Sequence, residues 1–394
     1  MLAPKTICEK RFGCNFSVTV QGLRGAFGAG AGPGPGYPDG VQHSGRPTIK
    51  DVARAAGVSP TTVSHALNGK GVVRRETVER IERIAAEIGY RPSAIARGLQ
   101  NSRLGLLALV IRPFHSLDTF LPEGVDYFLR IAGAASLSAM ERGYSMMLID
   151  DPTRPGVPFS ALAADAYIVT EPFENDPVLT MLSEQRIPFV TVGADPARRD
   201  LFPAIDEAAG QQAMTMIDHL SQAGAQRIAL VTGTDRNDWN LGSRQALVDW
   251  CEARGQQPLV LALPEAEGEQ VGERVIDHFF SGDPAERPDA IFCLTGRHAA
   301  GVTEAAIRRG IRVPEDLLVS AGSGAMQNRT SSPTVTTLDL RPEETAQLAV
   351  EVAVALAEGR PVQEPLATPT ARLDIRESTT RAPGGARQPP GRAR

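Results

Sequence analysis

Cysteine is scarce in this sequence, and the positions of the few cysteines exclude several classes of protein. The 394 residues include four cysteines, at positions 8, 14, 251 and 293, and their spacings match no metal-binding motif. Cys251 and Cys293 lie in apolar stretches that are typical of buried thiols. We therefore expect neither a disulfide scaffold nor a metal or other cofactor. The small number of cysteines fits a protein of the reducing cytoplasm.

Long hydrophobic runs are also missing. The longest apolar stretch, Leu104–Ile111, has the length of a strand rather than of a membrane span. The first 45 residues lack the apolar core of a signal peptide. The sequence therefore predicts no membrane partner, and this argues against a secreted solute-binding protein.

The residue patterns of common enzymes do not occur either. The chain has no Gly-x-Ser-x-Gly elbow, and His115, His219 and His278 have no carboxylate or cysteine partner at a useful spacing. Residues 22–45 are rich in Gly, Pro and Ala, but no strand precedes them and no helix follows, as a phosphate-binding loop would require. We expect no enzymatic activity, and we expect residues 1–45 to form a disordered extension.

Charge is distributed unevenly along the chain. The whole protein has a net charge of −5. The segment from Arg46 to Arg103 holds 11 Lys and Arg against 5 Asp and Glu, so it carries +6 and the remainder carries −11. A basic segment on an acidic body is typical of a protein that binds nucleic-acid phosphates through one module only.

The basic segment begins with a pattern for two short helices joined by a tight turn. Apolar residues recur at helical spacing over Ile49–Ala56. Thr48 and Asp51 form a capping pair before this helix, and Gly57 supplies the left-handed conformation that ends it. Ser59 caps the next helix. This pattern predicts a helix-turn-helix.

The second helix leaves a polar surface exposed. Val63, Ala66 and Leu67 pack back onto the first helix, and the remaining side chains are short and mostly uncharged: Pro60, Thr61, Thr62, Ser64, His65 and Asn68. Such side chains suit a helix that lies in the major groove of DNA. The alternative is an ordinary pair of bundle helices, since the same geometry occurs outside DNA-binding proteins.

A longer stretch of sequence favours DNA binding. A third helix is expected over Glu76–Gly89, with Arg74 in place of a hydroxyl cap, and the motifs Gly89-Tyr90-Arg91-Pro92 and Ala96-Arg97-Gly98-Leu99 follow. Together with residues 48–68, these motifs resemble the amino-terminal signature of the lactose-repressor (LacI/GalR) family of bacterial transcription regulators.

The resemblance implies roles for individual residues. Those that stand where family members read bases are Pro60, Thr61 and His65. Those that stand where phosphates are held are Thr48, Thr62, Ser64 and Asn68, next to the cap residue Ser59. Residues 93–99 resemble the hinge helix, and its DNA-binding positions are Ser93, Arg97 and Leu99. Leu99 matches the side chain that enters the minor groove; a plain linker leucine is the alternative.

Beyond the hinge, the pattern alternates between strands and helices, which predicts parallel sheets covered on both faces. Strands are expected near 104–111, 145–149, 166–169, 189–192, 227–231, 259–262, 290–293 and 317–321. Helices are expected near 125–142, 176–186, 206–223, 240–254, 268–280, 298–309 and 342–357, with one helix reduced or lost in 151–165. The motifs at 227–231, 310–316, 336–337 and 376–379 resemble the family's effector-binding domain, which is related to periplasmic sugar-binding proteins.

The fold class expected from these patterns is α/β, with an N-terminal all-α helix-turn-helix domain and two doubly wound parallel-sheet subdomains. The expected domains are a disordered extension (1–45), the helix-turn-helix domain (46–91), a hinge helix and linker (92–103), a two-lobed effector-binding and dimerisation domain (104–380) and a disordered tail (381–394).

The resemblance also implies an effector site in the cleft between the two lobes. Arg244 matches the arginine that family members point at the ligand, the alternative being a solvated helix arginine. The other candidates are Trp239, which can stack on a sugar or serve in the core, and Asn240, Ser323 and Arg297.

Two acidic residues common in the family are absent from this predicted cleft, since Gly296 and Ser323 occupy their positions. Their loss disfavours an ordinary hexose, and Arg297 and His298 suggest an anionic or phosphorylated ligand.

The sequence thus predicts a ligand-responsive repressor that binds a palindromic double-stranded DNA operator as a homodimer or larger assembly. Its effector is expected to be a sugar, a phosphosugar or a related metabolite. The alternatives are a solute-binding protein without a DNA role and, with no motif in its favour, an enzyme on a doubly wound fold.

Overall fold

The computed structural model describes residues 47–68, 73–90, 103–111, 126–362 and 366–381. The chain divides into two compact units, residues 1–92 and 93–394. The extension predicted over residues 1–45 and the hinge positions Ser93, Arg97 and Leu99 lie outside the described residues.

The described part of the first unit consists of helices α1 (Ile49–Ala56), α2 (Pro60–Leu67) and α3 (Arg75–Glu87). One side chain from each helix is fully buried, namely Val52, Val63 and Ile81, and alanines fill the space around them. Small residues at these positions let the helix axes approach closely. The three helices predicted from the sequence are therefore present.

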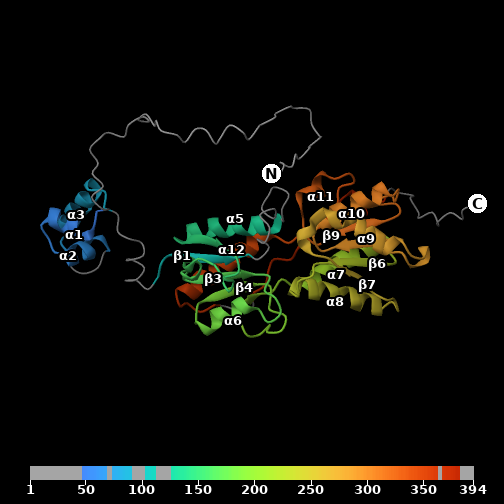
Figure 1. Ribbon diagram of the computed structural model, residues 1–394, viewed down its shortest axis with the longest axis horizontal. Coiled ribbons are helices and arrows are strands. Elements are labelled where there is room, and N and C mark those ends of the chain that lie inside the picture. Colours follow the sequence, from blue (N-terminus) through green and yellow to red (C-terminus); the bar gives the residue numbers. More distant parts are fainter. Residues whose placement is uncertain (1–46, 69–72, 91–102, 112–125, 363–365, 382–394) are drawn as a thin grey trace, which may run out of the picture. The chain divides into compact units, whose positions relative to one another are not determined.

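The second unit contains two sheets (Figure 1). The first has the strand order β2-β1-β3-β4-β5, and all its neighbouring strands are parallel. Its strands are β1 (Leu106–Val110), β2 (Ser145–Ile149), β3 (Ala166–Thr170), β4 (Phe189–Val192) and β5 (Ala204–Ile205).

The second sheet has the order β11-β10-β9-β8-β6-β7. It is parallel except for β11, which pairs antiparallel with β10. Its strands are β6 (Ile228–Thr232), β7 (Leu259–Ala262), β8 (Ala290–Cys293), β9 (Leu318–Ala321), β10 (Thr336–Asp339) and β11 (Arg372–Asp374).

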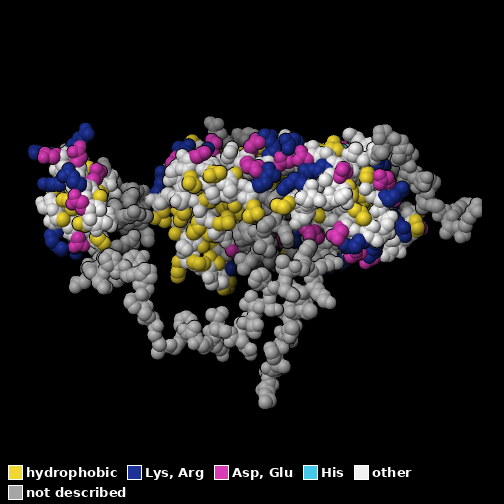
Figure 2. All heavy atoms as spheres, turned by 90° about the horizontal axis from the view of Figure 1, so that it is seen from above, with side chains coloured by type: hydrophobic (Ala, Val, Ile, Leu, Met, Phe, Trp, Pro, Cys, Tyr) yellow, Lys and Arg dark blue, Asp and Glu magenta, His cyan; other side chains and the backbone are white. Residues whose placement is uncertain are grey.

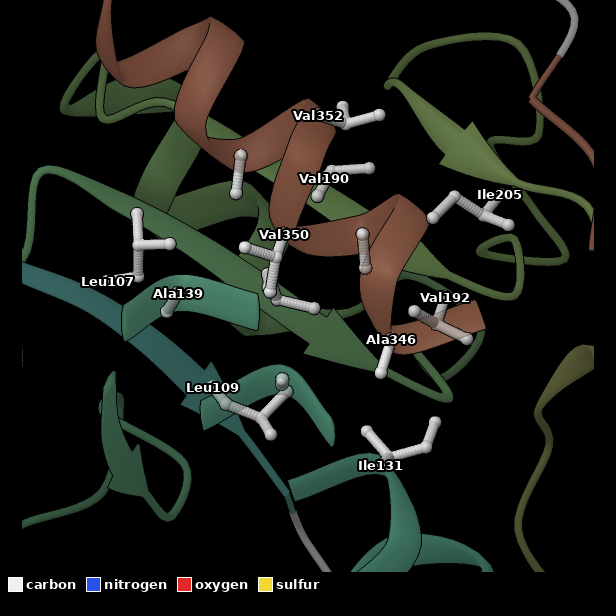
Figure 3. Packing of buried hydrophobic residues seen from close by; sticks show 14 of the residues in the cluster. Leu107, Leu109, Ile131, Ala139, Val190, Val192, Ile205, Ala346, Val350 and Val352 are labelled. Carbon is white, nitrogen blue, oxygen red and sulfur yellow. The ribbon is translucent and has the colours of Figure 1, made fainter. Parts of the chain in front are cut away.

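Helices cover both faces of the first sheet and complete the first lobe. Helices α5 (Asp126–Glu141) and α12 (Pro342–Ala357) pack on one face. Helix α6 (Pro177–Glu184) and the 3-10 helix η3 (Phe159–Leu162) pack on the other. Leu107 and Leu109 of β1 face α5 and α12, as Figure 3 shows, while the alternate residues face α6.

The second lobe is built in the same way. One face of its sheet carries α7 (Ala209–Gln222) and α8 (Asp238–Glu252), and the other carries α9 (Gly272–Phe280) and α10 (Gly296–Arg308). Its shorter elements are η4 (Glu265–Val271), η5 (Pro284–Glu286), α11 (Met326–Thr330) and η6 (Glu377–Thr379). The chain passes between the lobes at residues 206–208 and 340–341, and again after α12. This architecture confirms the predicted fold class.

Several boundaries differ from the prediction for local reasons. The helix predicted over 206–223 begins only at Ala209, because Ala208 has a φ of +50° and the preceding residues form β5. The helix predicted over 268–280 begins at Gly272, because Gly268 has a φ of +54°. Between residues 151 and 165 only the short η3 begins, as the reduced segment suggested.

Arg381 belongs to the folded unit although the sequence places it in the tail. Its guanidinium donates to the carbonyl oxygens of Pro314 and Ala223 at 3.2 and 3.1 Å. None of the helices in the described part of the chain combines the length and the apolar character that spanning a bilayer requires.

Candidate DNA-binding surface and interlobe site

The turn between α1 and α2 is built by its end residues. The Asp51 carboxylate accepts from the backbone N–H and the hydroxyl of Thr48, at 2.9 and 2.7 Å, and these hydrogen bonds lower the pKa of Asp51. Gly57 has a φ of +65° and ends α1 in the left-handed region, where a side chain would be strained. Ser59 then accepts from the backbone N–H of Thr62 at 3.1 Å. These contacts fix the direction in which α2 leaves the turn.

The predicted DNA-contacting residues gather on one side of α2. Ser59, Pro60, Thr61 and His65 are exposed, as is Thr48 before α1. The half-buried ones are Thr62, Ser64 and Asn68. This surface carries hydrogen-bonding groups without bulk, so a groove of DNA can approach it closely.

Local hydrogen bonds engage some of these groups. The hydroxyls of Ser59 and Thr62 lie 2.8 Å apart, and the Asn68 side chain donates to the Ser64 hydroxyl at 3.3 Å. A hydroxyl that is held in place by a neighbour can still accept or donate a further hydrogen bond. These contacts orient the side chains that the sequence assigns to phosphates.

The same unit carries exposed positive charge. Within the described residues, Lys50, Arg74, Arg80 and Arg83 are exposed cations to which no hydrogen bond or ion pair is assigned, whereas Arg75 contacts Glu79 at 3.0 Å. Arg74 directly precedes α3, where the free N–H groups of the helix end add positive potential.

The five predicted effector residues all lie beyond strand ends of the second sheet. Trp239 and Asn240 are in the first turn of α8 and are buried. Trp239 belongs to the core of the second lobe. Its ring lies so close to Gly322 that a Cβ atom added at position 322 would be 3.0 Å from the ring. Asn240 accepts from the N–H of Gly233 and donates to the carbonyl of Asp235, both at 3.0 Å. Both side chains therefore have structural contacts.

The other three candidates differ in their surroundings. Arg244 is exposed on α8 and has no assigned partner within the described residues. Ser323 is buried and donates to the carbonyl of Leu294 at 3.3 Å. Arg297 lies against Gly268, with the nearest Glu269 oxygen 3.8 Å away. The structure thus brings Trp239 and Ser323 to adjoining loops but does not place all five on one surface.

His298 does not support the anionic ligand that the sequence suggested. Its ring is fully buried on α10, and burial lowers its pKa to about 4. A neutral, buried imidazole adds no positive charge for a phosphate.

Acidic side chains instead collect where the two lobes meet. We define the interlobe cluster as Glu171, Glu207, Asp235, Asp238 and Glu265, which follow strands β3, β5, β6 and β7. Burial, and then the neighbouring carboxylates of the cluster, raise the pKa of Glu171 well above its usual value. Burial is also the main cause that raises the pKa of Glu207 and of Glu265 to about 7.

Hydrogen bonds and one ion pair among the described residues offset part of this charge. The Tyr127 hydroxyl of α5 donates to Glu207 at 2.6 Å. Arg199 pairs with Asp238, with one nitrogen–oxygen distance of 3.2 Å. Within the described residues, no group of three or more His, Cys, Asp and Glu side chains is placed to hold a metal ion.

Sequence reasoning missed the interlobe cluster. The sequence did contain an indication of this cluster, because Glu171 and Glu207 come directly or almost directly after buried strands. In doubly wound folds the carboxyl ends of parallel strands face the ligand site.

Two family profiles match the chain. Residues 48–93 match "Bacterial regulatory proteins, lacI family", and residues 217–379 match "Periplasmic binding protein-like domain". The chain is 29% identical over 307 residues to the HTH-type transcriptional repressor PurR of Klebsiella pneumoniae (strain 342), a match covering 74% of this chain and 84% of the relative. PurR of Escherichia coli O1:K1 / APEC is 27% identical over the same length.

Solved structures share the fold. The Lac repressor dimer bound to operator and the anti-inducer ONPF superposes with a TM-score of 0.70 at 22% identity, covering 85% of this chain and 99% of that one. A complex of the transcriptional regulator CelR with cellobiose gives a TM-score of 0.58 at 22% identity, covering 84% of this chain and 100% of the other.

Proposed function

Because this chain belongs to the LacI/GalR family of bacterial transcriptional regulators, we propose that it is a cytoplasmic repressor that binds a palindromic operator as a dimer. Binding of a small molecule lowers or raises its affinity for the operator. The observation that carries this proposal is the exposed polar side of α2, held by capped turns within residues that match the lacI profile. The family is one of regulators rather than enzymes.

Two copies are needed for specific recognition. Helix α2 has eight residues, so one copy reads only a few base pairs. A two-fold dimer reads both halves of a palindrome. Large apolar side chains exposed in the first lobe support such pairing: Leu137 and Met140 on α5, Leu148 on β2, and Phe159 and Leu162 on η3. Figure 2 shows hydrophobic side chains gathered on this lobe.

The effector is proposed to bind between the lobes. The interlobe cluster supplies carboxylate acceptors for hydroxyl groups, replacing the two acids missing at Gly296 and Ser323. Carboxylates repel phosphate groups, so among the candidate effectors a neutral sugar or a related metabolite fits better than a phosphosugar. Arg244 is an exposed cation on α8 and is proposed to approach the ligand from outside the cluster.

The direct test is selection of genomic fragments by the purified full-length protein, followed by footprinting of the enriched sites. We expect a footprint with two-fold symmetry and an affinity well above that for bulk competitor DNA. Leu99→Ala is expected to weaken specific binding while leaving non-specific binding intact. Absence of any enriched fragment, with or without added metabolites, would overturn the proposal and favour a solute-binding protein without a DNA role.

A further inference from the structure

A single carboxylate holds the chain where it enters the first lobe. Residues 93–102 connect the DNA-binding unit to this lobe in sequence and lie outside the described residues. The half-buried Asp165 directly precedes β3. Its carboxylate accepts from the backbone N–H groups of Leu104, Gly105 and Leu106 at 2.7, 2.6 and 3.0 Å. Three donors thus converge on one side chain within four residues of the connecting segment.

A turn at Gly105 makes this convergence possible. Gly105 has a φ of +70°, so the chain changes direction there in a conformation that favours glycine. Its carbonyl accepts from the N–H of Ser145, the first residue of β2, at 2.8 Å. The Leu106 carbonyl accepts from the N–H of Asp165 at 2.7 Å. The turn is therefore fixed to the strands on both sides of β1 (Figure 1). We refer to Gly105 and Asp165 as the linker anchor.

The linker anchor joins the connecting segment to a rigid part of the lobe. Leu107, the next residue of β1, is fully buried, and helices cover both faces of the sheet. Hydrogen bonds to an ionised carboxylate are stronger than those between neutral groups. If they are lost, residues 104–106 can detach and lengthen the connection by up to about 10 Å in each copy.

The second lobe has the same kind of contact at a place where no other unit is attached. Asp289 directly precedes β8 and is buried. Its carboxylate accepts from the N–H of Gln226 at 3.0 Å and from that of Arg227 at 2.8 Å. These two residues connect α7 to β6 within the lobe. Asp289 therefore provides a matched comparison that separates support of a lobe from control of a connection between units.

We propose that the linker anchor fixes the length and the direction of the connection to the DNA-binding unit, and that Asp165 is thereby a positioning residue for recognition of the palindrome. This inference rests on the proposed function as a dimeric operator-binding repressor. In a dimer, the second DNA-binding unit meets its half-site at an effective concentration set by the length and stiffness of its linker. Fixed anchors favour one spacing of the half-sites, whereas released anchors lower the affinity at that spacing and spread it over others.

The test measures the affinity of the full-length protein for the selected palindrome and for versions with base pairs inserted at its centre. Two inserted base pairs rotate one half-site by about 70° about the DNA axis. We expect the parent protein to lose at least about tenfold in affinity on this insertion, because its linkers are fixed. Asp165→Ala should bind the natural spacing about threefold to tenfold more weakly and lose less than about threefold on insertion. Both proteins should bind an isolated half-site equally. Each spacing comparison is a ratio from one preparation, so any loss of folded protein cancels.

Further variants isolate the contact. Asp165→Asn keeps one acceptor oxygen and should lie between the parent and Asp165→Ala. Gly105→Ala strains the same turn and should also reduce the dependence on spacing. Asp289→Ala is the matched control and should keep the steep dependence of the parent. Hydrogen exchange checks that each change acts locally: residues 104–106 should exchange at least about tenfold faster in Asp165→Ala, and residues 226–227 in Asp289→Ala.

The outcomes separate this inference from the proposed function. A parent protein that selects no DNA overturns both. A parent that prefers one spacing, with the same preference in Asp165→Ala, overturns the linker anchor alone. Equal loss of the preference in Asp289→Ala also overturns it, because the two carboxylates would then act only through the folding of their lobes. Unchanged exchange of residues 104–106 in Asp165→Ala overturns it as well, since the carboxylate would not be holding them.

Discussion

Replacing Ile81 by alanine tests whether the DNA-binding unit is held together by its own small core. Ile81 is fully buried on α3, in one cluster with Val52 of α1 and Val63 of α2. Truncating a buried isoleucine to alanine removes apolar packing and leaves a cavity, which together cost about 2–5 kcal/mol.

This cost is comparable with the whole stability of such a unit. At roughly 0.05–0.15 kcal/mol per residue, a unit of about 45 residues has a free energy of unfolding of about 2–7 kcal/mol. Ile81→Ala should therefore leave a large fraction of the helix-turn-helix unfolded near its working temperature. The two lobes have separate cores and should keep their stability.

Hydrogen exchange read by mass spectrometry distinguishes the two units in one sample. We expect reduced protection in α1–α3, unchanged protection in the sheets, and at least a tenfold decrease in DNA affinity. Glu82→Ala, an exposed change on the same helix, is the control and should alter neither. Unchanged protection in α1–α3 of the Ile81 variant, or an equal decrease in both units, would refute the idea of an independent core.

Four further predictions concern DNA and assembly. His65→Ala should flatten base preference at one position of each half-site, by about 1–3 kcal/mol, as read from affinities for single-base operator variants. Thr62→Ala should weaken binding to all sequences alike, and the same panel checks this. Arg74→Ala should reduce the slope of log affinity against log salt concentration by about 0.9 for each phosphate that Arg74 neutralises. Arg75→Ala is the comparison and should change the slope less, because Arg75 is already paired with Glu79. Leu137→Glu should convert dimers to monomers in sedimentation, because it places a charge on an apolar surface.

The helix-turn-helix could be predicted almost completely because its determinants are local. Asp51, Gly57 and Ser59 act on the backbone within a few residues of themselves, and the structure places each in the expected cap. Most strands could be predicted for a similar reason, since buried parallel strands are short continuous apolar runs. Among the exceptions are β5 and β11, with two and three residues, which are too short to show such a run. The prediction failed where one residue changes the backbone direction, as at Ala208 and Gly268.

The interlobe site was not predictable because it depends on which loops of the two lobes meet. Glu171 and Glu265 are far apart in sequence, and each taken alone is an ordinary acidic residue after a strand. Their proximity requires the relative position of two sheets, which no local pattern specifies. The same holds for the isolated bridge between Phe173 and Asn237, since nothing in the sequence around either residue indicates this pairing.

The structure gives a physical reason why one expected acid is missing. A Cβ at Gly296 would collide with the Asn328 side chain and lie 2.8 Å from the Cβ of Ala325. Asn328 is fully buried there, donating to the Gly296 carbonyl at 2.8 Å and accepting from the Ala325 N–H at 2.9 Å. An amide that joins the loops after β8 and β9 thus occupies the space that an aspartate at position 296 would need. The carboxylates of Glu171 and Glu207, which follow other strands, lie instead where the lobes approach each other.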